Sequence, residues 1–443
     1  MSDWEEDRDA CVNLRDKYSD MGRGNITRIE LSQHLKVGII GCTNVGKSTF
    51  FNAFAGVKNK LKLSEVHNSL FTTVDNNCVT IEVSDPQMDL ITATFPTIVG
   101  KKKYLTLIDT PGIIKNSRNG AGVGISGLDS IRNVDIILHV VRGFDDNELT
   151  VTYEGTVDAE RDLRIVEQEL MLEDLLIIDN TINVFILEIE NKNGGKELRY
   201  EYDLLLKVYE ILVGEPRPPL KRRKGVIVRP PFPTACRGKP IRFGDFDTTE
   251  VVYLKKYNFF TAKEVLYLVN LTPRDFMRKS TVPAYISKMR EMIGPNSYFL
   301  PMSAVFESSL FEEELAGTLS SYLEANPTHI SVIPTIIEEC YRRLNLIQFY
   351  TIDNGVALSW LTSRGSQLIF AGTLISDLHE KNFLSGDVCT VGEYCNGEGD
   401  WMRLLKEGIA QNRSGKYNIN DRDIVRYRLR DPTTGKSKKL EEL

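Results

Sequence analysis

Residues 41 to 48 read GCTNVGKS and match the pattern G-x-x-x-x-G-K-[ST]. They lie between a short apolar strand, KVGIIG, and a helical segment, KSTFFNAFAG, which is the context in which this pattern binds nucleotide phosphates. Gly41 and Gly46 let backbone N–H groups point at the phosphates, and the helix N-terminus adds a partial positive charge. We predict that Lys47 contacts the β- and γ-phosphates and that Ser48 offers its hydroxyl oxygen to magnesium.

A magnesium–nucleotide site needs further oxygen ligands, because Mg²⁺ demands near-octahedral geometry. Asp109 ends the apolar run YLTLID and opens the motif DTPG, where the N–H of Gly112 can reach a γ-phosphate. Thr73, in the polar segment NSLFTTVD, is the second candidate ligand, and its place before Asp109 fits a switch loop that orders around the ligand. The Gly-rich segment GAGVGISG (120–127) fits either a second switch or a flexible surface loop.

Ile113 follows Gly112 at the position where Ras-like GTPases use a Gln to orient the attacking water. An aliphatic side chain cannot orient water. We therefore expect hydrolysis to be slow or to depend on a group supplied from elsewhere, and the sequence identifies no catalytic residue.

The apolar run VLYLV ends at Asn270, and strand ends are where α/β proteins place ligand-reading groups. Asn270 can donate to N7, which both purines carry. Guanine also presents two adjacent donors that pair with a carboxylate, which the Asp of the usual N-K-x-D motif supplies; this chain has Pro273 at the position of that Asp. Losing charged hydrogen bonds of roughly 1.5–3 kcal/mol each removes most guanine preference, so we expect ATP to be preferred over GTP or discrimination to be weak. Asp275 is the alternative carboxylate, and Ser303 and Ala304 can offer backbone groups to the base.

These residues need a scaffold that brings several strand ends together. Apolar runs alternate with helical or loop segments, which favours an α/β fold with a mostly parallel sheet. The runs are KVGIIG (36–41), CVTIEV (78–83), YLTLID (104–109), DIILHVV (135–141), EVLYLV (264–269) and YFLPMS (298–303). We assign a nucleotide-binding domain to residues 36–158 and 245–304.

Residues 159–244 interrupt this alternation. Apolar residues recur at three- and four-residue spacing through 159–213 and are broken once by NKNGGK, which predicts an inserted antiparallel helical hairpin. Two core-packing helices and a projecting arm both fit, and the length of the first helix favours the arm. The stretch 216–242 then carries nine Lys or Arg, seven Pro and no Asp or Glu. It is either a solvated linker or a basic loop that contacts a phosphate backbone.

Residues 346–432 predict a small α+β module. Its β-rich segments are LIQFYTI, VALSWLT, DVCTV and DIVRYRLR, and TLISDLHEK (373–381) has a helical pattern. We interpret residues 305–345 as a helical connector, 1–35 as an N-terminal extension and 433–443 as a disordered tail.

The composition limits the class of protein. A net charge of −6 argues against nucleic-acid binding by the whole surface but allows a local basic patch. The seven Cys are scattered without a C-x-x-C pair, which argues against a zinc site or a disulfide framework. The N-terminus is acidic and polar, and no apolar run approaches the roughly 18 residues of a membrane span. We expect a cytoplasmic protein without a membrane partner, and we make no prediction of its oligomeric state.

The motifs, in this order, resemble the YchF family, also called Obg-like ATPases, among the P-loop translation-factor-related NTPases. The matching segments are KVGIIGCTNVGKSTFFNAF, LFTTV, DTPGI, IILHVVRGF, VDAERDLRIVEQEL, VLYLVNL, PMSAVFES and YLEAN. FYTIDNGVALSWLTSRGSQ and DRDIVRYRL are similar to a TGS domain. The resemblance implies a P-loop NTPase domain with an inserted helical hairpin, followed by a C-terminal β-grasp (TGS) domain.

The resemblance also implies an ATPase or GTPase switch that associates with the ribosome or RNA. It places magnesium ligands at Ser48 and Thr73 and a nucleotide contact at Leu271. Further nucleotide contacts fall on Asn44, Val45, Gly46, Lys47, Ser48 and Thr49. A hydrophobic residue such as Ile113 conforms to the family. Two features depart from it: Pro273 stands where members usually have Glu, and the segment FDDNELTVTYEG lacks the loop His thought to help hydrolysis.

Two functions from different classes remain open. One is a magnesium-dependent purine-nucleotide-binding switch with slow hydrolysis of ATP or GTP. The other is a catalytically impaired, nucleotide-gated binding or scaffold protein on the same fold. Intact Lys47, Ser48, Thr73 and Asp109 favour magnesium–nucleotide binding in either case. A small-molecule kinase fits GKST alone, but the DTPG motif and the C-terminal module disfavour it.

Overall fold

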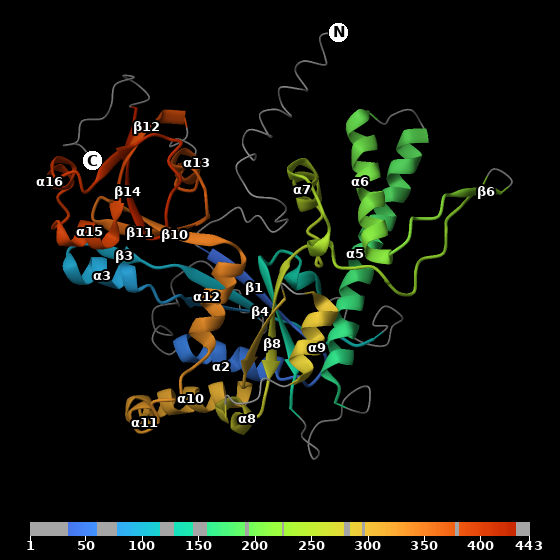
Figure 1. Cartoon of the computed structure of the whole chain (residues 1–443), viewed down its shortest axis with the longest axis horizontal. Coiled ribbons are helices and arrows are strands. Elements are labelled where there is room, and N and C mark those ends of the chain that lie inside the picture. Colours follow the sequence, from blue (N-terminus) through green and yellow to red (C-terminus); the bar gives the residue numbers. More distant parts are fainter. Residues whose placement is uncertain are drawn as a thin grey trace, which may run out of the picture. The chain divides into compact units, whose positions relative to one another are not determined.

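The computed structural model describes residues 34–59, 78–115, 128–144, 157–190, 195–223, 226–278, 284–294, 297–376 and 381–430 (Figure 1). They fall into two compact units. The first holds the described residues of 37–57 and 108–332, and the second those of 34–36, 58–107 and 333–430. The predicted domain boundaries differ from this division, because 58–107 fall in the second unit, and they stay predictions. Thr73, the Gly-rich segment 120–127, residues 1–33 and the predicted tail lie outside the described residues.

A six-stranded sheet with the order β2-β4-β1-β5-β8-β9 carries the strand ends that the sequence pointed to. Neighbours among β1, β5, β8 and β9 are parallel, and β5 is buried along its whole length. Strands covered on both faces read as continuous apolar runs, which is why the sequence revealed them. The expected α/β fold with a mostly parallel sheet is confirmed. The strands are β1 (His34–Ile40), β2 (Cys78–Glu82), β4 (Tyr104–Asp109), β5 (Ile136–Arg142), β8 (Glu264–Asn270) and β9 (Tyr298–Met302).

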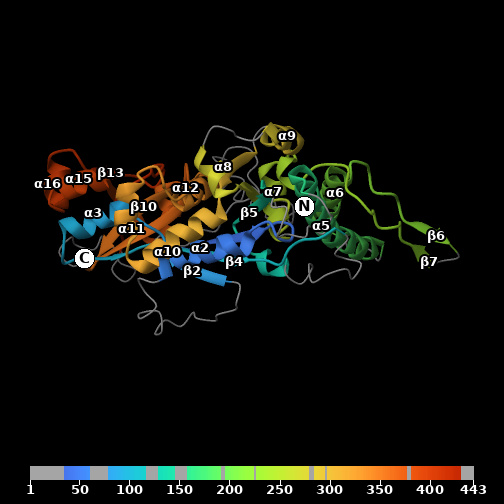
Figure 2. The same ribbon diagram turned by 90° about the horizontal axis from the view of Figure 1, so that it is seen from below.

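Helices lie on both sides of these strands. Figure 1 shows α2 (Lys47–Asn59) and α10 (Ala304–Ala316) on one side, and α5 (Ala159–Glu190) and α9 (Ala284–Ile293) on the other. Figure 2 also places α10 beside α2. Their contact is close, since a Cβ on Gly56 of α2 would lie 2.4 Å from Cζ of Phe311 in α10. The other helical elements of the first unit are η3 (Asp129–Ile131), η4 (Ile241–Phe243), α7 (Thr248–Lys255), α8 (Pro273–Arg278) and α11 (Leu319–Ala325).

The predicted helical hairpin consists of α5, which has 32 residues, and α6 (Lys196–Val213). Apolar residues of the two helices form a shared core that includes Leu175, Ile178, Leu205, Val208 and Leu212. Helix α6 ends at Gly214, whose φ of 86° lies in the left-handed region that favours glycine. In the basic stretch that follows, β6 (Lys221–Arg223) and β7 (Val226–Val228) form an antiparallel two-stranded sheet.

The second unit contains a mixed sheet with the order β13-β12-β14-β10-β11-β3. The four β-rich segments of the C-terminal module are strands. Of the helix predicted at 373–381, residues 377–380 lie outside the described residues; α13 covers Leu368–Thr373, and residues 381–382 are helical. The sequence did not predict β3 (Val99–Lys101), which pairs in parallel with β11 and is too short to show a period-two pattern. The remaining elements are α3 (Pro86–Thr94), α12 (Ile333–Arg343), β10 (Leu346–Asp353), β11 (Val356–Ser363), β12 (Phe383–Thr390), α15 (Val391–Asn396), α16 (Trp401–Lys406), β13 (Gln411–Arg413) and β14 (Asp423–Leu429).

Candidate functional site

The loop between β1 and α2 has the backbone that the GCTNVGKS motif requires. Asn44 and Gly46 adopt positive φ angles of 59° and 96°. A Cβ on Gly46 would lie 2.2 Å from Nδ2 of Asn270, and a Cβ on Gly41 would lie 2.4 Å from the carbonyl oxygen of Val140. Both glycines are therefore needed for the loop to pass close to the ends of β5 and β8. Asn44, Ser48 and Thr49 are exposed, whereas Val45 is buried.

Lys47, the first residue of α2, is buried inside this loop and is 6% exposed. Its Nζ donates to the carbonyl oxygens of Gly41, at 3.1 Å, and Cys42, at 2.6 Å. Burial lowers the pKa of Lys47 to about 8, while the charge of Asp109 acts in the opposite direction. The ammonium group is thus positioned by the loop that is predicted to hold the phosphates.

Ser48 and Asp109 meet at the carboxyl end of β4. The Ser48 hydroxyl donates to Oδ2 of Asp109 at 2.9 Å. Oδ1 of Asp109 is buried and has no hydrogen-bond partner among the described residues. Burial raises the pKa of Asp109, and the Ser48 hydroxyl and the charge of Lys47 lower it. An unpaired carboxylate oxygen beside a hydroxyl is a suitable start for a Mg²⁺ site, because this ion prefers oxygen ligands.

No three His, Cys, Asp or Glu side chains in the described ranges gather closely enough to hold a metal ion by themselves. Mg²⁺ in nucleotide sites is held by one or two carboxylates together with phosphates and waters, so Ser48 and Asp109 fit that kind of site. The third predicted ligand, Thr73, lies outside the described residues.

The DTPGI segment is fixed against the phosphate loop. Thr110 donates its hydroxyl to the carbonyl oxygen of Ile39 at 2.7 Å, and the N–H of Ile113 donates to Gly41 O at 3.0 Å. A Cβ on Gly112 would lie 2.5 Å from Cγ2 of Thr43, so the two loops are in direct contact. The side chain of Ile113 is 1% exposed. It fills space in the protein and presents nothing to a water molecule.

Asn270 connects the phosphate loop to the start of α10. Its Nδ2 donates to the carbonyl oxygen of Val45 at 2.9 Å, and its Oδ1 accepts from the N–H of Ala304 at 2.9 Å. Ser303 is fully buried and caps α10, because its hydroxyl accepts from Phe306 N. Leu271 is buried, and its N–H donates to Met302 O at 2.8 Å. The structure thus brings the predicted base-reading residues together, with the Ala304 N–H used to hold Asn270.

Pro273 is the first residue of the short helix α8. Proline is favoured there, because its ring fixes a helical φ and the N–H it lacks would have no partner in the helix. Thr272 precedes it as the helix cap: its hydroxyl accepts from Asp275 N at 3.1 Å and donates to Asp275 Oδ2 at 2.8 Å. The Asp275 carboxylate, considered above as a substitute for the missing acid, is therefore engaged in this cap. The segment T-P-R-D carries a capping pattern that the sequence analysis did not recognise.

The sequence analysis also missed a buried charged cluster behind the site. Arg242, from the basic stretch, donates to both carboxylate oxygens of Glu167 in α5, at 2.8 and 3.0 Å, and to the hydroxyl of Tyr267 in β8 at 2.9 Å. His139 of β5 lies against Tyr267, and burial lowers its pKa to about 4, so it is neutral at pH 7. Contacts that span 75 and 100 residues leave no local signal in the sequence.

A strand, a glycine-bounded phosphate loop and a helix, with an Asp at the end of a neighbouring strand and an Asn near the loop, define a P-loop nucleotide-binding protein. Residues 36–181 match a protein-family model described as "50S ribosome-binding GTPase". Obg-like ATPase 1 of Oryza sativa subsp. indica is 30% identical over 415 residues, which cover 91% of this chain and 94% of the relative. Obg-like ATPase 1 of Homo sapiens is 29% identical over 408 residues, with the same two coverages.

A solved structure, titled the Schizosaccharomyces pombe YchF GTPase, is 28% identical to the chain. It superposes with a TM-score of 0.69 over 92% of this chain and 99% of that one. The chain belongs to the Obg-like ATPase (YchF) family, whose members are nucleotide-binding proteins of the GTPase type. None of the helices in the described part of the chain combines the length and apolar character needed to cross a membrane.

Proposed function

We propose that this chain is a magnesium-dependent purine-nucleotide switch that hydrolyses its nucleotide slowly, binds ATP at least as well as GTP, and works in association with the ribosome. The observation that carries the proposal is the placement of the buried Lys47 and the half-buried Asp109 around Ser48, where the start of α2 meets the end of β4. The phosphate loop thus offers a cation for the phosphates, and Ser48 and Asp109 offer two neighbouring side chains with oxygens for a metal ion.

In this proposal Ser48, Thr73 and Asp109 hold the ion, which would offset the charge of the β- and γ-phosphates when bound. The backbone of Gly41 and of residues 44–49 surrounds the phosphates. The N–H of Gly112 faces the γ-phosphate, and its contact with the phosphate loop supports a response of the DTPGI segment to that group. Thr73, in the first predicted switch loop, would respond to the γ-phosphate together with the DTPGI segment.

Base preference follows from the corner formed by Asn270, Leu271, Ser303 and Ala304. Guanine needs a carboxylate for its two adjacent donors, and neither Pro273 nor the capped Asp275 offers one. Adenine needs no carboxylate at this position, so the missing acid does not weaken its binding. The relatives' own names include both an ATPase and a GTPase, so the corner itself is the better guide to this chain.

A competition titration of MgATP against MgGTP tests the base preference. We expect ATP to bind more tightly than GTP, or the two to bind within roughly tenfold of each other, because the charged hydrogen bonds that select guanine are missing. Tight binding of GTP with no measurable binding of ATP would reject the proposal.

A second candidate function, a nucleotide-gated binding protein without useful hydrolysis, is favoured by the burial of Ile113. Phosphate release in a single turnover separates the two, with Lys47→Ala as the reference. A slow wild-type rate that exceeds the rate of the variant supports the switch. Equal rates support the binding protein.

Association with the ribosome is supported by the description of the family model that matches residues 36–181. We propose that the module of residues 346–432 is a β-grasp (TGS) domain that engages RNA or protein there. Co-sedimentation with ribosomes, with ATP and with ADP, tests this part. Equal absence from the ribosomal fraction in both conditions would contradict it.

A further inference from the structure

The segment of residues 216–238, here named the basic arm, leaves helix α6 and returns to the end of the same helix. The N–H groups of residues 237–239 donate to the carbonyl oxygens of residues 211–213 at distances of 2.8–3.2 Å. A Cβ on Gly238 would lie 2.0 Å from the carbonyl oxygen of Ile211, so only glycine allows the returning backbone to come this close. The arm is therefore a closed loop with both ends fixed on α6.

Two further contacts tie the base of the arm to α5. The Arg217 side chain is 2% exposed and donates to Asp179 at 2.7 Å and to Asn183 at 3.0 Å. At the other end, Cys236 exchanges two backbone hydrogen bonds with the side-chain amide of Gln168. The proline-rich basic stretch thus has a defined attachment, which a solvated linker would not need.

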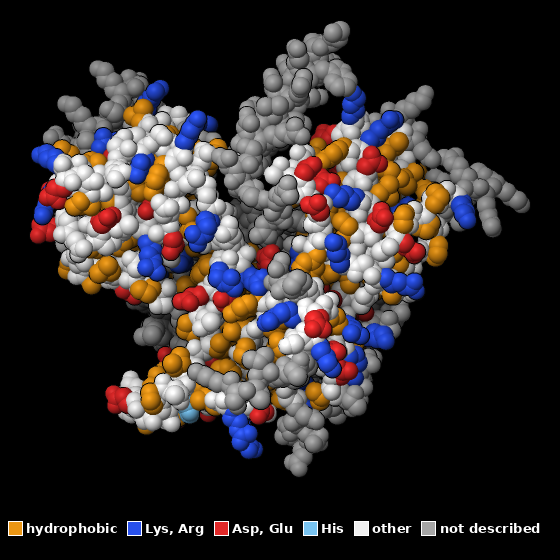
Figure 3. All heavy atoms as spheres, in the orientation of Figure 1, with side chains coloured by type: hydrophobic (Ala, Val, Ile, Leu, Met, Phe, Trp, Pro, Cys, Tyr) orange, Lys and Arg blue, Asp and Glu red, His pale blue; other side chains and the backbone are white. Residues whose placement is uncertain are grey.

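Every charged residue of the arm is a Lys or an Arg. Figures 1 and 2 both show β6 and β7 extending away from α5 and α6. β6 has the sequence Lys-Arg-Arg, and between residues 216 and 238 there is no Asp or Glu. Lys221, Arg229 and Arg237 are exposed and form no ion pair with any described residue. Over α6, by contrast, Figure 3 shows positive and negative side chains intermixed.

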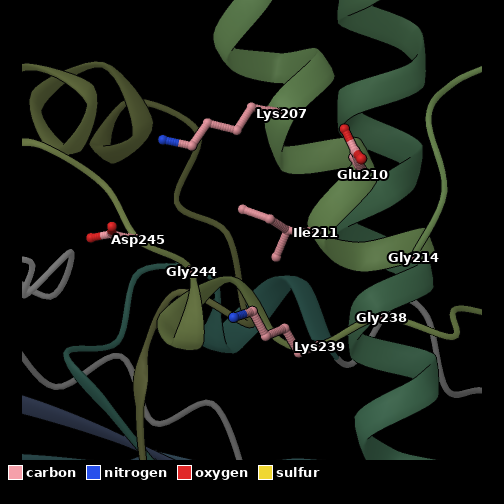
Figure 4. A pocket seen from close by; sticks show the side chains of 8 residues that line it. All are labelled: Lys207, Glu210, Ile211, Gly214, Gly238, Lys239, Gly244 and Asp245. Atoms are coloured by element: carbon pink, nitrogen blue, oxygen red, sulfur yellow. The ribbon is translucent and has the colours of Figure 1, made fainter.

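A hollow of about 560 Å³ at the base of the arm marks where this surface ends (Figure 4). Its lining includes Lys207 and Lys239, but also Glu210 and Asp245. Lys207 is already paired with Glu250 at 2.8 Å. The carboxylates in this lining make the hollow a poor site for phosphate. The charged residues of the arm itself, in contrast, are all positive.

We propose that the basic arm binds the phosphate backbone of RNA. Most of its cations are Arg, whose planar guanidinium pairs with phosphate oxygens through two hydrogen bonds. The one aromatic residue of the arm, Phe232, packs against the core of the helical hairpin, so the arm has no free aromatic side chain to anchor it at a membrane surface. The choice of RNA as the phosphate source rests on the proposed association with the ribosome.

The test compares two triple variants of the full-length chain that each remove three positive charges. The arm variant is Lys221→Ala, Arg229→Ala and Arg237→Ala. The control variant changes three exposed residues of α6 and α9, namely Arg199→Ala, Lys288→Ala and Arg290→Ala. Binding to a mixed-sequence duplex RNA of about 16 base pairs is measured over a series of salt concentrations. Calorimetry with MgATP on the same samples reports whether each variant remains folded and competent.

We expect the wild type to bind the duplex with an affinity that falls as salt rises. In the arm variant the slope of log K against log salt should be smaller by about three, one for each phosphate that is no longer neutralised, and the control variant should keep the wild-type slope. Equal slopes for both variants would overturn the proposal, because overall charge would then explain the binding. Arm-dependent binding to phosphatidylserine vesicles or polyglutamate, with none to RNA, would overturn it as well. A wild-type chain that binds RNA but does not bind MgATP would instead reject the proposed nucleotide switch.

Discussion

Pro273 and Asn270 have separate tasks in the corner predicted to read the base. Asn270 joins the phosphate loop to the start of α10 through two hydrogen bonds. Neither bond depends on whether the bound base is adenine or guanine. Pro273 starts α8 and has no group that could contact a base. In the proposed function, the position that would distinguish guanine is therefore held by a residue that starts the local helix.

Replacing Pro273 by Asp should restore part of the missing guanine selectivity. An acid is compatible with the first turn of α8, where Asp275 already lies. We expect Pro273→Asp to shift the affinity ratio towards GTP by roughly 10- to 100-fold, which corresponds to about one charged hydrogen bond. A competition titration measures the ratio, and Pro273→Ala is the control for loss of the ring. The same ratio in both variants would show that this position does not face the base.

Gly46 should be far more sensitive to substitution than a glycine elsewhere. In Gly46→Ala the new Cβ would overlap Asn270 at a φ of 96°, so the loop must shift and nucleotide affinity should fall by at least roughly 100-fold. Gly195→Ala is the matched control, because no atom lies within 4 Å of its added Cβ. Nucleotide titrations of both variants give the comparison. Unchanged affinity in Gly46→Ala would mean that the loop does not hold the phosphates in this form.

The helical hairpin is fastened to the sheet by buried polar groups as well as by apolar packing. Asp174 of α5 accepts hydrogen bonds from Phe260 N at 2.8 Å and from the N–H and hydroxyl of Thr261, both at 2.7 Å. Nearer the site, Cys42 of the phosphate loop donates to Asp162 O in the first turn of α5 at 3.4 Å. Helix α5 therefore contacts both the phosphate loop and the segment before β8.

The Asp174 attachment gives a pH-dependent prediction. Burial raises the pKa of Asp174 to about 6, against donors that lower it. A carboxyl with a raised pKa in the folded state contributes stability that is present at low pH and is lost as the pH rises through that pKa. Asp174→Asn should cost about 1–3 kcal/mol, because its amide cannot accept all the same hydrogen bonds. The difference in unfolding free energy between wild type and variant should be larger at pH 5 than at pH 7.

Urea unfolding at the two pH values measures this difference directly. Comparison with the variant removes the contributions of the other titrating groups. A difference that grows from pH 5 to pH 7 would contradict a raised pKa of Asp174.

Local patterns explain how much of the fold and site the sequence could reveal. The phosphate loop, Asp109 and Asn270 could be proposed from the sequence because each lies at the end of an apolar run that forms a strand. Glu167, Asp174 and the capping role of Thr272 were not found. The first two act on partners 75 to 100 residues away, and the third was read as part of a base-reading motif. Strand β3 was missed because three residues show no period.

At the scale of the whole chain, relations between segments far apart in the sequence also leave no local signal. The described residues of 58–107 belong to the same compact unit as residues 333–430, and no change in composition marks that relation in the sequence. A net charge of −6 likewise conceals a segment of purely positive charge. Composition and net charge therefore indicate the class of protein. The location of a binding site depends on where individual segments lie in the fold.

Calorimetry with ATP, GTP and their diphosphates, each with and without Mg²⁺, tests the magnesium-dependent purine switch most directly. Ser48 and Asp109 at the phosphate loop predict that removing Mg²⁺ weakens the triphosphates more than the diphosphates. The corner around Asn270 and Pro273 predicts that ATP binds at least as tightly as GTP, or within roughly tenfold of it. Binding of GTP alone, or an affinity for ATP that is unchanged when Mg²⁺ is removed, would contradict this account.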